Sequence, residues 1–186
     1  MLDVVRRASP RLKRMCQGSV PSILDLGCGE GRNTLYTLFK GIYTCALDIS
    51  PRCLERVDKA ARSLRLRGLL DLLVADVSHM PFRDECFEAI LDSYLYTFIR
   101  DRESYACRIA KMLKAGGKLL LEYDMSPHLL PHARLLALLA PFDRQLVQVS
   151  LELLYHEWGD VGNEELEQVP AISALYVAPL SQEKTC

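Results

Sequence analysis

The chain lacks the features that draw a protein to charged surfaces, metals or membranes. Its formal net charge is −1 over 186 residues, so no overall field attracts it to nucleic acid or to a membrane surface. Its seven cysteines include no C-x-x-C pair and no His/Cys ligand spacing, so neither a zinc site nor a disulfide framework is indicated. No apolar run approaches the roughly 20 residues that cross a bilayer. We therefore expect a cytoplasmic protein with reduced thiols, without a metal site or a membrane-spanning segment.

The charges that are present are unevenly distributed. The segment from Gln145 to Cys186 holds seven acids against Lys184 alone, whereas basic residues crowd the N-terminus at Arg6, Arg7, Arg11, Lys13 and Arg14. The basic segment lies so close to the first apolar run that it leaves too little chain for a removable transit peptide, and no signal peptide is expected. We interpret it as a first helix whose basic residues either form a solvated face or dock on a protein or RNA.

Short apolar segments alternate with helical patterns, which predicts an α/β fold. The expected strands are 22–26, 42–49, 69–75, 87–92 and 118–123, and the helices between them are 31–39, 51–67 and 102–113. Ser50 suits a helix N-cap before Pro51, and Gly116-Gly117 suit a helix end. Strand followed by helix, repeated, implies a doubly wound, mostly parallel sheet with helices on both faces.

The C-terminal part changes character. Apolar and polar residues alternate with a period of two from Leu146 to His156, and the run 171–178 is typical of a final strand. Two strands joined without a helical period form a hairpin, so we expect the last strand to be antiparallel to the rest. A length of 186 residues suits a single domain, 1–186.

The most informative stretch is ILDLGCGEGRNT, residues 23–34. An apolar strand leads into Asp25 and then into glycines at 27, 29 and 31, before a helical pattern begins. Glycines at this spacing form a turn in which a ligand approaches the backbone closely and meets the free N–H groups of a helix start. In the dinucleotide pattern G-x-G-x-x-G the third glycine is replaced here by Arg32, and a carboxylate before the turn suits an ammonium group better than a pyrophosphate. The stretch therefore indicates a nucleotide site other than one for NAD.

Acidic residues follow the next strands, at the edge where open parallel sheets bind ligands. Asp48 lies 21 residues after the first glycine, at the distance where an acid accepts hydrogen bonds from ribose hydroxyls. Asp76 is placed to accept from an adenine amine while the Val77 N–H donates to a ring nitrogen, and Asp92 and Ser93 end the fourth predicted strand. Taken singly, Asp48 also suits a helix N-terminal charge and Asp76 a turn cap. Their joint occurrence carries the prediction.

Together these motifs resemble those of class I S-adenosylmethionine-dependent methyltransferases, in the broad branch that includes many small-molecule methyltransferases. The matches are ILDLGCGEGRNT, ALDIS, LLVADVSHMPF, FEAILDSYLYTF and MLKAGGKLLLEY, in family order from Ile23 to Tyr123. The resemblance implies a seven-stranded sheet with a reversed last strand, and S-adenosylmethionine as the cofactor. It also implies a cofactor-binding core at 21–124, between an N-terminal helical segment at 1–20 and a substrate-side and hairpin region at 125–186.

The resemblance also assigns roles within the core. The acid before the glycine turn and the first glycine lie by the methionine moiety, and the acid after the second strand holds the ribose. The Asp-Val pair after the third strand binds adenine, and the backbone after the fourth strand meets the methionine amino group. The implied cofactor-binding residues are Asp25, Gly27, Cys28, Gly29, Gly31, Asn33, Asp48, Ile49, Asp76, Val77, Asp92 and Ser93.

No catalytic residue is identified, because methyl transfer from a sulfonium needs a positioned nucleophile and a general base is optional. The family's N-methylating signature, Asn or Asp followed by two prolines and an aromatic residue, is absent, since DSY stands at 92–94. Candidate substrate-binding residues are Tyr94, Tyr96 and His128, although alternate aromatics can equally pack a helix and a histidine can be structural. The irregular stretch 127–131 is a candidate lid over the methyl group.

The sequence thus predicts an enzyme that transfers a methyl group from S-adenosylmethionine to a small-molecule acceptor by in-line displacement. Glu122 and Asp124, like the histidines, are weak candidates for proton removal. Two alternatives stay open: a protein or RNA methyltransferase that docks through its basic N-terminus, and a non-catalytic S-adenosylmethionine-binding partner subunit. No feature of the chain indicates an oligomeric state.

Overall fold

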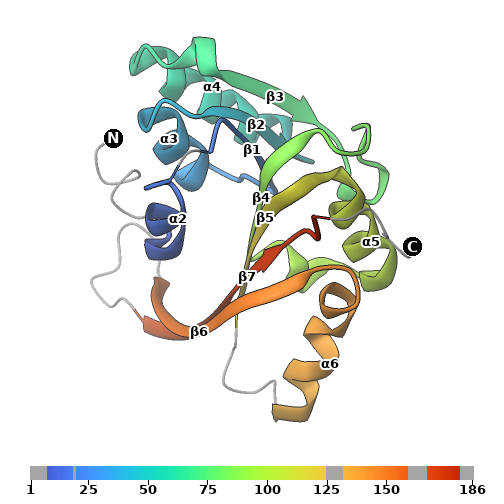
Figure 1. Ribbon diagram of the computed structural model, residues 1–186. Coiled ribbons are helices and arrows are strands. Elements are labelled where there is room, and N and C mark those ends of the chain that lie inside the picture. The colour runs from blue at the N-terminus through green and yellow to red at the C-terminus, as the bar shows by residue number, and fades with distance from the viewer. Residues whose placement is uncertain (1–7, 19, 125–131, 159–166, 181–186) are drawn as a thin grey trace.

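A seven-stranded sheet organises the molecule (Figure 1). The computed structural model describes residues 8–18, 20–124, 132–158 and 167–180. The strands are β1 (Ser22–Leu26), β2 (Tyr43–Asp48), β3 (Leu70–Val74), β4 (Phe87–Ser93), β5 (Leu113–Asp124), β6 (Val147–Trp158) and β7 (Glu167–Val177). The α-helices are α2 (Pro10–Met15), α3 (Arg32–Phe39), α4 (Pro51–Ser63), α5 (Arg102–Met112) and α6 (His132–Asp143). Short 3-10 turns lie at η1 (Arg67–Leu69), η2 (Val77–His79) and η3 (Tyr96–Phe98).

The strand order is β3-β2-β1-β4-β5-β7-β6, which places β1 and β4 at the centre. Neighbours from β3 to β5 pair in parallel, whereas β7 pairs antiparallel with both β5 and β6. Because parallel neighbours end at the same edge, the carboxyl ends of β1 to β4 meet there. The predicted α/β sheet with an antiparallel C-terminal hairpin is confirmed.

Helices cover both faces of the sheet. Successive strand residues point to opposite sides, so each face presents apolar side chains on which the helices pack. On one face, α5 and α6 bury Ile109 and Phe142 in the same apolar cluster as Leu24. On the other face, α2 buries Leu12 in a second apolar cluster with Ile23, the β1 residue directly before Leu24. Residues of α3 and α4 form a third apolar cluster. Packing on both faces holds the strands in place, and with them the carboxyl ends at which the site lies.

Local signals decide where two helices begin and end. α4 begins after Ser50, whose side chain accepts a hydrogen bond from Cys53 N at 3.4 Å, as the N-cap prediction requires. The predicted helix end at Gly116-Gly117 is wrong, because α5 ends at Met112 and the chain enters β5 directly. Both glycines lie inside β5 at a register shift: Gly116 N donates to Ala178 O at 3.1 Å, and Ala178 N donates to Gly117 O at 2.8 Å.

Cysteine spacing along the sequence does not report which thiols meet in space. Cys107 is disulfide-bonded, so the expectation of reduced thiols is wrong at this position. The other cysteines within the described ranges are free: Cys16, Cys28, Cys45, Cys53 and Cys86. Across those ranges, no helix has both the length and the apolar character needed to span a membrane. Nor do the residues described there bring three His, Cys, Asp or Glu side chains together for a metal ion.

Candidate cofactor and active site

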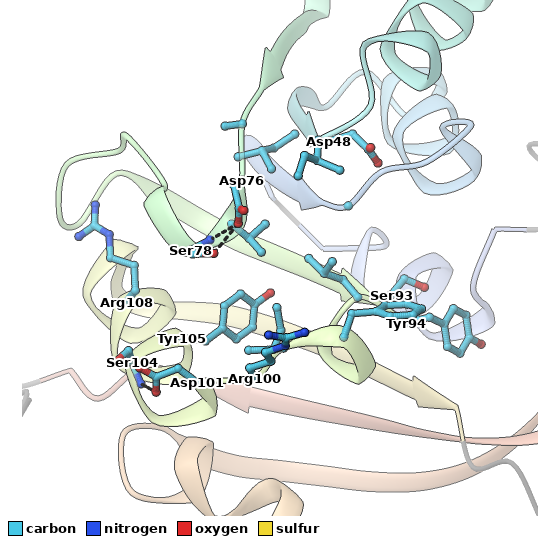
Figure 2. A pocket seen from close by; sticks show the side chains of 18 residues that line it. Asp48, Asp76, Ser78, Ser93, Tyr94, Arg100, Asp101, Ser104, Tyr105 and Arg108 are labelled. Atoms are coloured by element: carbon cyan, nitrogen blue, oxygen red, sulfur yellow. Dashed lines mark hydrogen bonds between the residues drawn. The ribbon is translucent and has the colours of Figure 1, made fainter.

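A cavity of about 670 Å³ lies at the carboxyl ends of β1 to β4 (Figure 2). Asp48 and Asp76 reach it from the ends of β2 and β3, and Ser93 and Tyr94 from the end of β4. The remaining wall comes from η3 and the first turns of α5, where Tyr105 is one of the lining residues. The edge that the sequence predicts as a ligand site is therefore hollowed to the size of a small-molecule pocket.

The glycine turn is shaped for close packing. Gly27 lines the cavity with φ +61°, and a Cβ there would lie 3.1 Å from the Leu95 side chain. Gly31 has φ +83°, and its Cβ would lie only 2.7 Å from Val57 of α4. A side chain at either position would have to adopt a left-handed backbone conformation in crowded surroundings. Glycine at 31 therefore lets α3 and α4 approach each other beside the pocket.

Asp48 joins the glycine turn to the second strand. Its Oδ2 accepts a hydrogen bond from Gly29 N at 2.8 Å, and its Oδ1 accepts one from Ser50 N at 2.8 Å. A carboxylate offers about four acceptor positions, so these two bonds leave capacity for hydroxyl donors in the cavity. The helix-start interpretation of Asp48 and the ligand interpretation are thus compatible in one geometry.

Asp76 caps the short turn that follows β3. Its Oδ1 accepts hydrogen bonds from Ser78 N at 2.8 Å and from the Ser78 hydroxyl at 2.5 Å, and these bonds hold the pKa of Asp76 below its usual value. The side chain is exposed at the cavity mouth, and Val77 beside it also lines the wall. Asp76 is therefore an ionised acceptor held in place by the turn that it caps.

The side chains of two predicted acids, Asp25 and Asp92, are buried, and neither residue is among those that line the cavity. Asp25 is 2% exposed, and its Oδ2 accepts a hydrogen bond from the Thr34 hydroxyl at 2.5 Å. Asp92 is 0% exposed and accepts hydrogen bonds from Tyr96 N at 3.0 Å and from the Tyr105 hydroxyl at 2.7 Å. Burial raises the pKa of Asp25 to about 6 and that of Asp92 to about 7.

The rest of the predicted set divides in the same way. Gly27, Asp48, Ile49, Asp76, Val77 and Ser93 line the cavity, as does the candidate substrate residue Tyr94. Cys28, Gly29, Gly31 and Asn33 are not among the lining residues. Cys28, Gly29 and Gly31 form the turn between β1 and α3, and Asn33 lies in the first turn of α3.

The two remaining substrate candidates have different outcomes. Tyr96 is 0% exposed, and its ring packs against Tyr105, Tyr123 and Phe142 in the core, with centroid separations of 5.0 to 6.1 Å. Tyr96 thus packs in the core, as the alternative of an aromatic residue packed against a helix predicts. His128 and the candidate lid at 127–131 lie outside the described residues.

Sequence reasoning missed the wall supplied by the start of α5. Arg100, Asp101, Ser104, Tyr105 and Arg108 all line the cavity (Figure 2). The helix that follows a parallel strand begins near the carboxyl edge of the sheet, where ligands bind. The start of the helix after the fourth strand could therefore have been predicted to line the cavity. Arg108 is held by Asp84 Oδ1 at 2.6 Å, which fixes that side of the wall.

The described residues fit S-adenosylmethionine on chemical grounds. Asp48 and Asp76 supply carboxylate acceptors for hydroxyl and amine donors, and Ile49 and Phe98 supply exposed apolar surface, 68% and 79% exposed, at the cavity wall. A sulfonium cofactor that also carries an ammonium group suits a site with several nearby carboxylates. The cavity volume also lies within the usual range for ligands of this size.

Comparison with known proteins agrees with this chemistry. Residues 24–121 match the family model described as "Methyltransferase domain". A demethylmenaquinone methyltransferase of Tropheryma whipplei is 29% identical over 62% of this chain and 46% of its own length. An aklanonic acid methyltransferase of a Streptomyces species is 31% identical over 52% of this chain and 45% of its own length. The chain thus spans about half the length of these curated relatives.

Solved structures show the same fold at lower identity. A methyltransferase from Methanosarcina mazei, described as S-adenosylmethionine-dependent, superposes with a TM-score of 0.73 at 18% identity, covering 94% of this chain and 100% of its own. TehB from Haemophilus influenzae gives a TM-score of 0.74 at 17% identity, covering 91% of this chain and 62% of its own. With the family match extending over more than half of the sequence, the chain belongs to the class I S-adenosylmethionine-dependent methyltransferases.

Proposed function

We propose that this protein transfers a methyl group from S-adenosylmethionine to a small-molecule acceptor. The observation that carries the proposal is the cavity at the glycine turn, where Asp48 and Asp76 present carboxylates beside apolar walls. The relatives named for demethylmenaquinone and aklanonic acid act on small molecules, which supports the same class of acceptor here.

Within this proposal, Asp48 accepts hydrogen bonds from ribose hydroxyls and Asp76 accepts one from the adenine amine. Ile49 and Phe98 cover the base and exclude water from it. When bound, the cofactor supplies an electrophilic methyl group on a positively charged sulfur. The chain contributes mainly by positioning, because holding two reactants in line accounts for much of such a rate.

The described basic residues near the N-terminus give no support to the macromolecular alternative. Arg14 pairs with Glu152 at 2.5 Å, and Lys13 lies 6.0 Å from the centre of the Tyr36 ring. These cations are engaged within the chain, as expected of a helix face that packs or is solvated. A cytoplasmic location stays a prediction from the sequence, and the disulfide at Cys107 weighs against the reduced thiols on which that prediction rested.

Labelled methyl transfer tests the proposed activity. We expect transfer of radioactive methyl from S-adenosylmethionine to at least one acceptor in a panel that includes demethylmenaquinone and aklanonic acid. A matched reaction with the Asp48→Asn variant should show much less product at the same cofactor concentration. Product at equal rates from wild type and variant would contradict the assigned site, and transfer only to RNA or protein would favour the macromolecular alternative.

A further inference from the structure

Ser9 attaches residues 8–18, the described part of the N-terminal segment, which contains α2, to the sheet edge that carries the site. It is 4% exposed and precedes α2. Its hydroxyl donates to Glu122 Oε1, and its backbone N donates to Asn33 Oδ1 at 3.3 Å. Leu12 N in turn donates to Ser9 Oγ at 3.3 Å, so the first turn of α2 depends on the same hydroxyl. Asn33, predicted to bind the cofactor, here binds the N-terminal segment.

Glu122 connects this attachment to the cavity wall. It lies in β5, is 2% exposed, and its second oxygen, Oε2, accepts a hydrogen bond from the Ser93 hydroxyl at 2.6 Å. Its backbone carbonyl accepts one from Tyr94 N at 2.8 Å. Ser93 and Tyr94 both line the cavity (Figure 2). One residue therefore holds two consecutive wall residues and, through Ser9, the N-terminal segment.

Arg32 secures the same wall from the glycine turn. Its guanidinium donates to Ser93 Oγ at 3.1 Å and lies 5.7 Å from the centre of the Tyr94 ring. Tyr94 has φ +71°, a left-handed conformation that a residue with a side chain keeps only when its surroundings impose it. The wall geometry therefore depends on the contacts from Glu122 and Arg32.

A buried carboxylate is stable only while donors satisfy it. Ser9 donates to one oxygen of the Glu122 carboxylate and Ser93 donates to the other. Loss of the Ser9 hydroxyl therefore leaves Oε1 buried without that donor, and the carboxylate and the Ser93 hydroxyl must rearrange to satisfy it. We propose that Glu122 is a positioning residue that couples docking of the N-terminal segment at Ser9 to the geometry of the Ser93–Tyr94 wall. The proposal rests on the proposed function in that the wall is taken to bind S-adenosylmethionine.

Affinity for S-adenosylhomocysteine, the demethylated product of the cofactor, tests the coupling and is measured by calorimetry. Ser9 does not line the cavity, yet Ser9→Ala should weaken binding by about fivefold or more, the lower range of measured site couplings. Ser22→Ala is the matched control, because Ser22 donates to the Glu88 carboxylate at the start of β1, at the opposite edge of the sheet. Ser22→Ala should bind with wild-type affinity.

Amide hydrogen exchange supplies the reciprocal measurement, since coupling between two sites acts equally in both directions. S-adenosylhomocysteine should slow exchange at Leu12 and Lys13, whose amides bond to Ser9. The Glu122→Met variant keeps a side chain of similar size but can neither accept from nor donate to the two serine hydroxyls, so this slowing should disappear. If Glu122→Met does not fold, Ser9→Ala replaces it in the same measurement.

The outcomes separate two failures. A wild-type chain that does not bind S-adenosylhomocysteine overturns the proposed function and the coupling with it. A wild-type chain that binds, together with a folded Ser9→Ala variant of unchanged affinity, overturns the coupling alone. Equal losses of affinity in Ser9→Ala and Ser22→Ala would also overturn it, because they would reflect a general loss of stability.

Discussion

At the scale of single residues, Asp92 links burial to the pH dependence of stability. Burial raises its pKa from 3.8 to about 7, so between these values the folded chain holds a proton that the unfolded chain has released. The stability from this group is fully present below pH 3.8 and is lost as the pH rises through about 7. The free energy of unfolding, measured in urea, should therefore fall between pH 5 and pH 8.

The Asp92→Asn variant isolates this contribution. Its amide oxygen can accept from Tyr96 N while its NH₂ group donates to the Tyr105 oxygen, so the contacts survive without a titratable group. The fall between pH 5 and pH 8 should be smaller in this variant. Part of it should persist, because burial also raises the pKa of Asp25, to about 6. An equally steep fall in both proteins would show that Asp92 is not the source.

Asp48 is the residue whose substitution should reduce cofactor affinity most directly. A hydrogen bond to a charged group contributes about 1.5 to 3 kcal/mol, so Asp48→Asn should weaken S-adenosylhomocysteine binding about 10- to 100-fold. Asp58→Asn is the control, since Asp58 pairs with Arg62 and Arg67 away from the cavity. A dissociation constant for Asp48→Asn within about twofold of wild type would reject the ribose role.

At this scale the sequence located acids well but not their exposure. Asp48 and Asp76 could be predicted because each follows a strand that ends at the ligand edge. Asp25 and Asp92 could not be placed, because their burial depends on Thr34 and Tyr105, which pack around them only in the folded chain. The signal for Tyr105 lies on the next helix, outside any motif.

At the scale of elements, the contact between α3 and α4 should be sensitive to the glycine turn. Gly31→Ala would place a Cβ 2.7 Å from Val57 at φ +83°. Backbone strain and overlap together should lower the free energy of unfolding by about 2 to 4 kcal/mol. Denaturant titration measures this loss.

Two further variants separate strain from overlap. Gly68→Ala, at a glycine with no atom within 4 Å of its Cβ position, should change stability by no more than about 0.5 kcal/mol. In a Val57→Ala background, Gly31→Ala should cost less than in wild type, because the overlap is gone and only the strain is left. An equal cost in both backgrounds would show that Val57 does not limit the approach.

The elements themselves were largely predictable, since apolar strands and amphipathic helices have different periods. The junction between α5 and β5 was not, because Gly116-Gly117 suit a helix end and a strand irregularity equally well. The pairing of Gly116 and Gly117 with Ala178, from the end of the chain, decides between them. Such long-range pairing leaves no local trace in the sequence.

At the scale of the whole molecule, ligand binding should stabilise the fold. A ligand that binds only the folded state at 100 times its dissociation constant adds about 2.7 kcal/mol. S-adenosylhomocysteine should therefore raise the melting temperature of the wild-type chain in a concentration-dependent way. Asp48→Asn should need a higher concentration for the same rise, and Asp58→Asn should follow the wild type.

The central claim is that the cavity at the glycine turn binds S-adenosylmethionine. Calorimetric titration of the wild-type chain with S-adenosylhomocysteine tests it most directly, because it needs no knowledge of the methyl acceptor. We predict saturable binding with one site per chain, weakened by Asp48→Asn and unaffected by Asp58→Asn. No heat of binding at high micromolar ligand, from a chain that is folded by circular dichroism, would contradict the account.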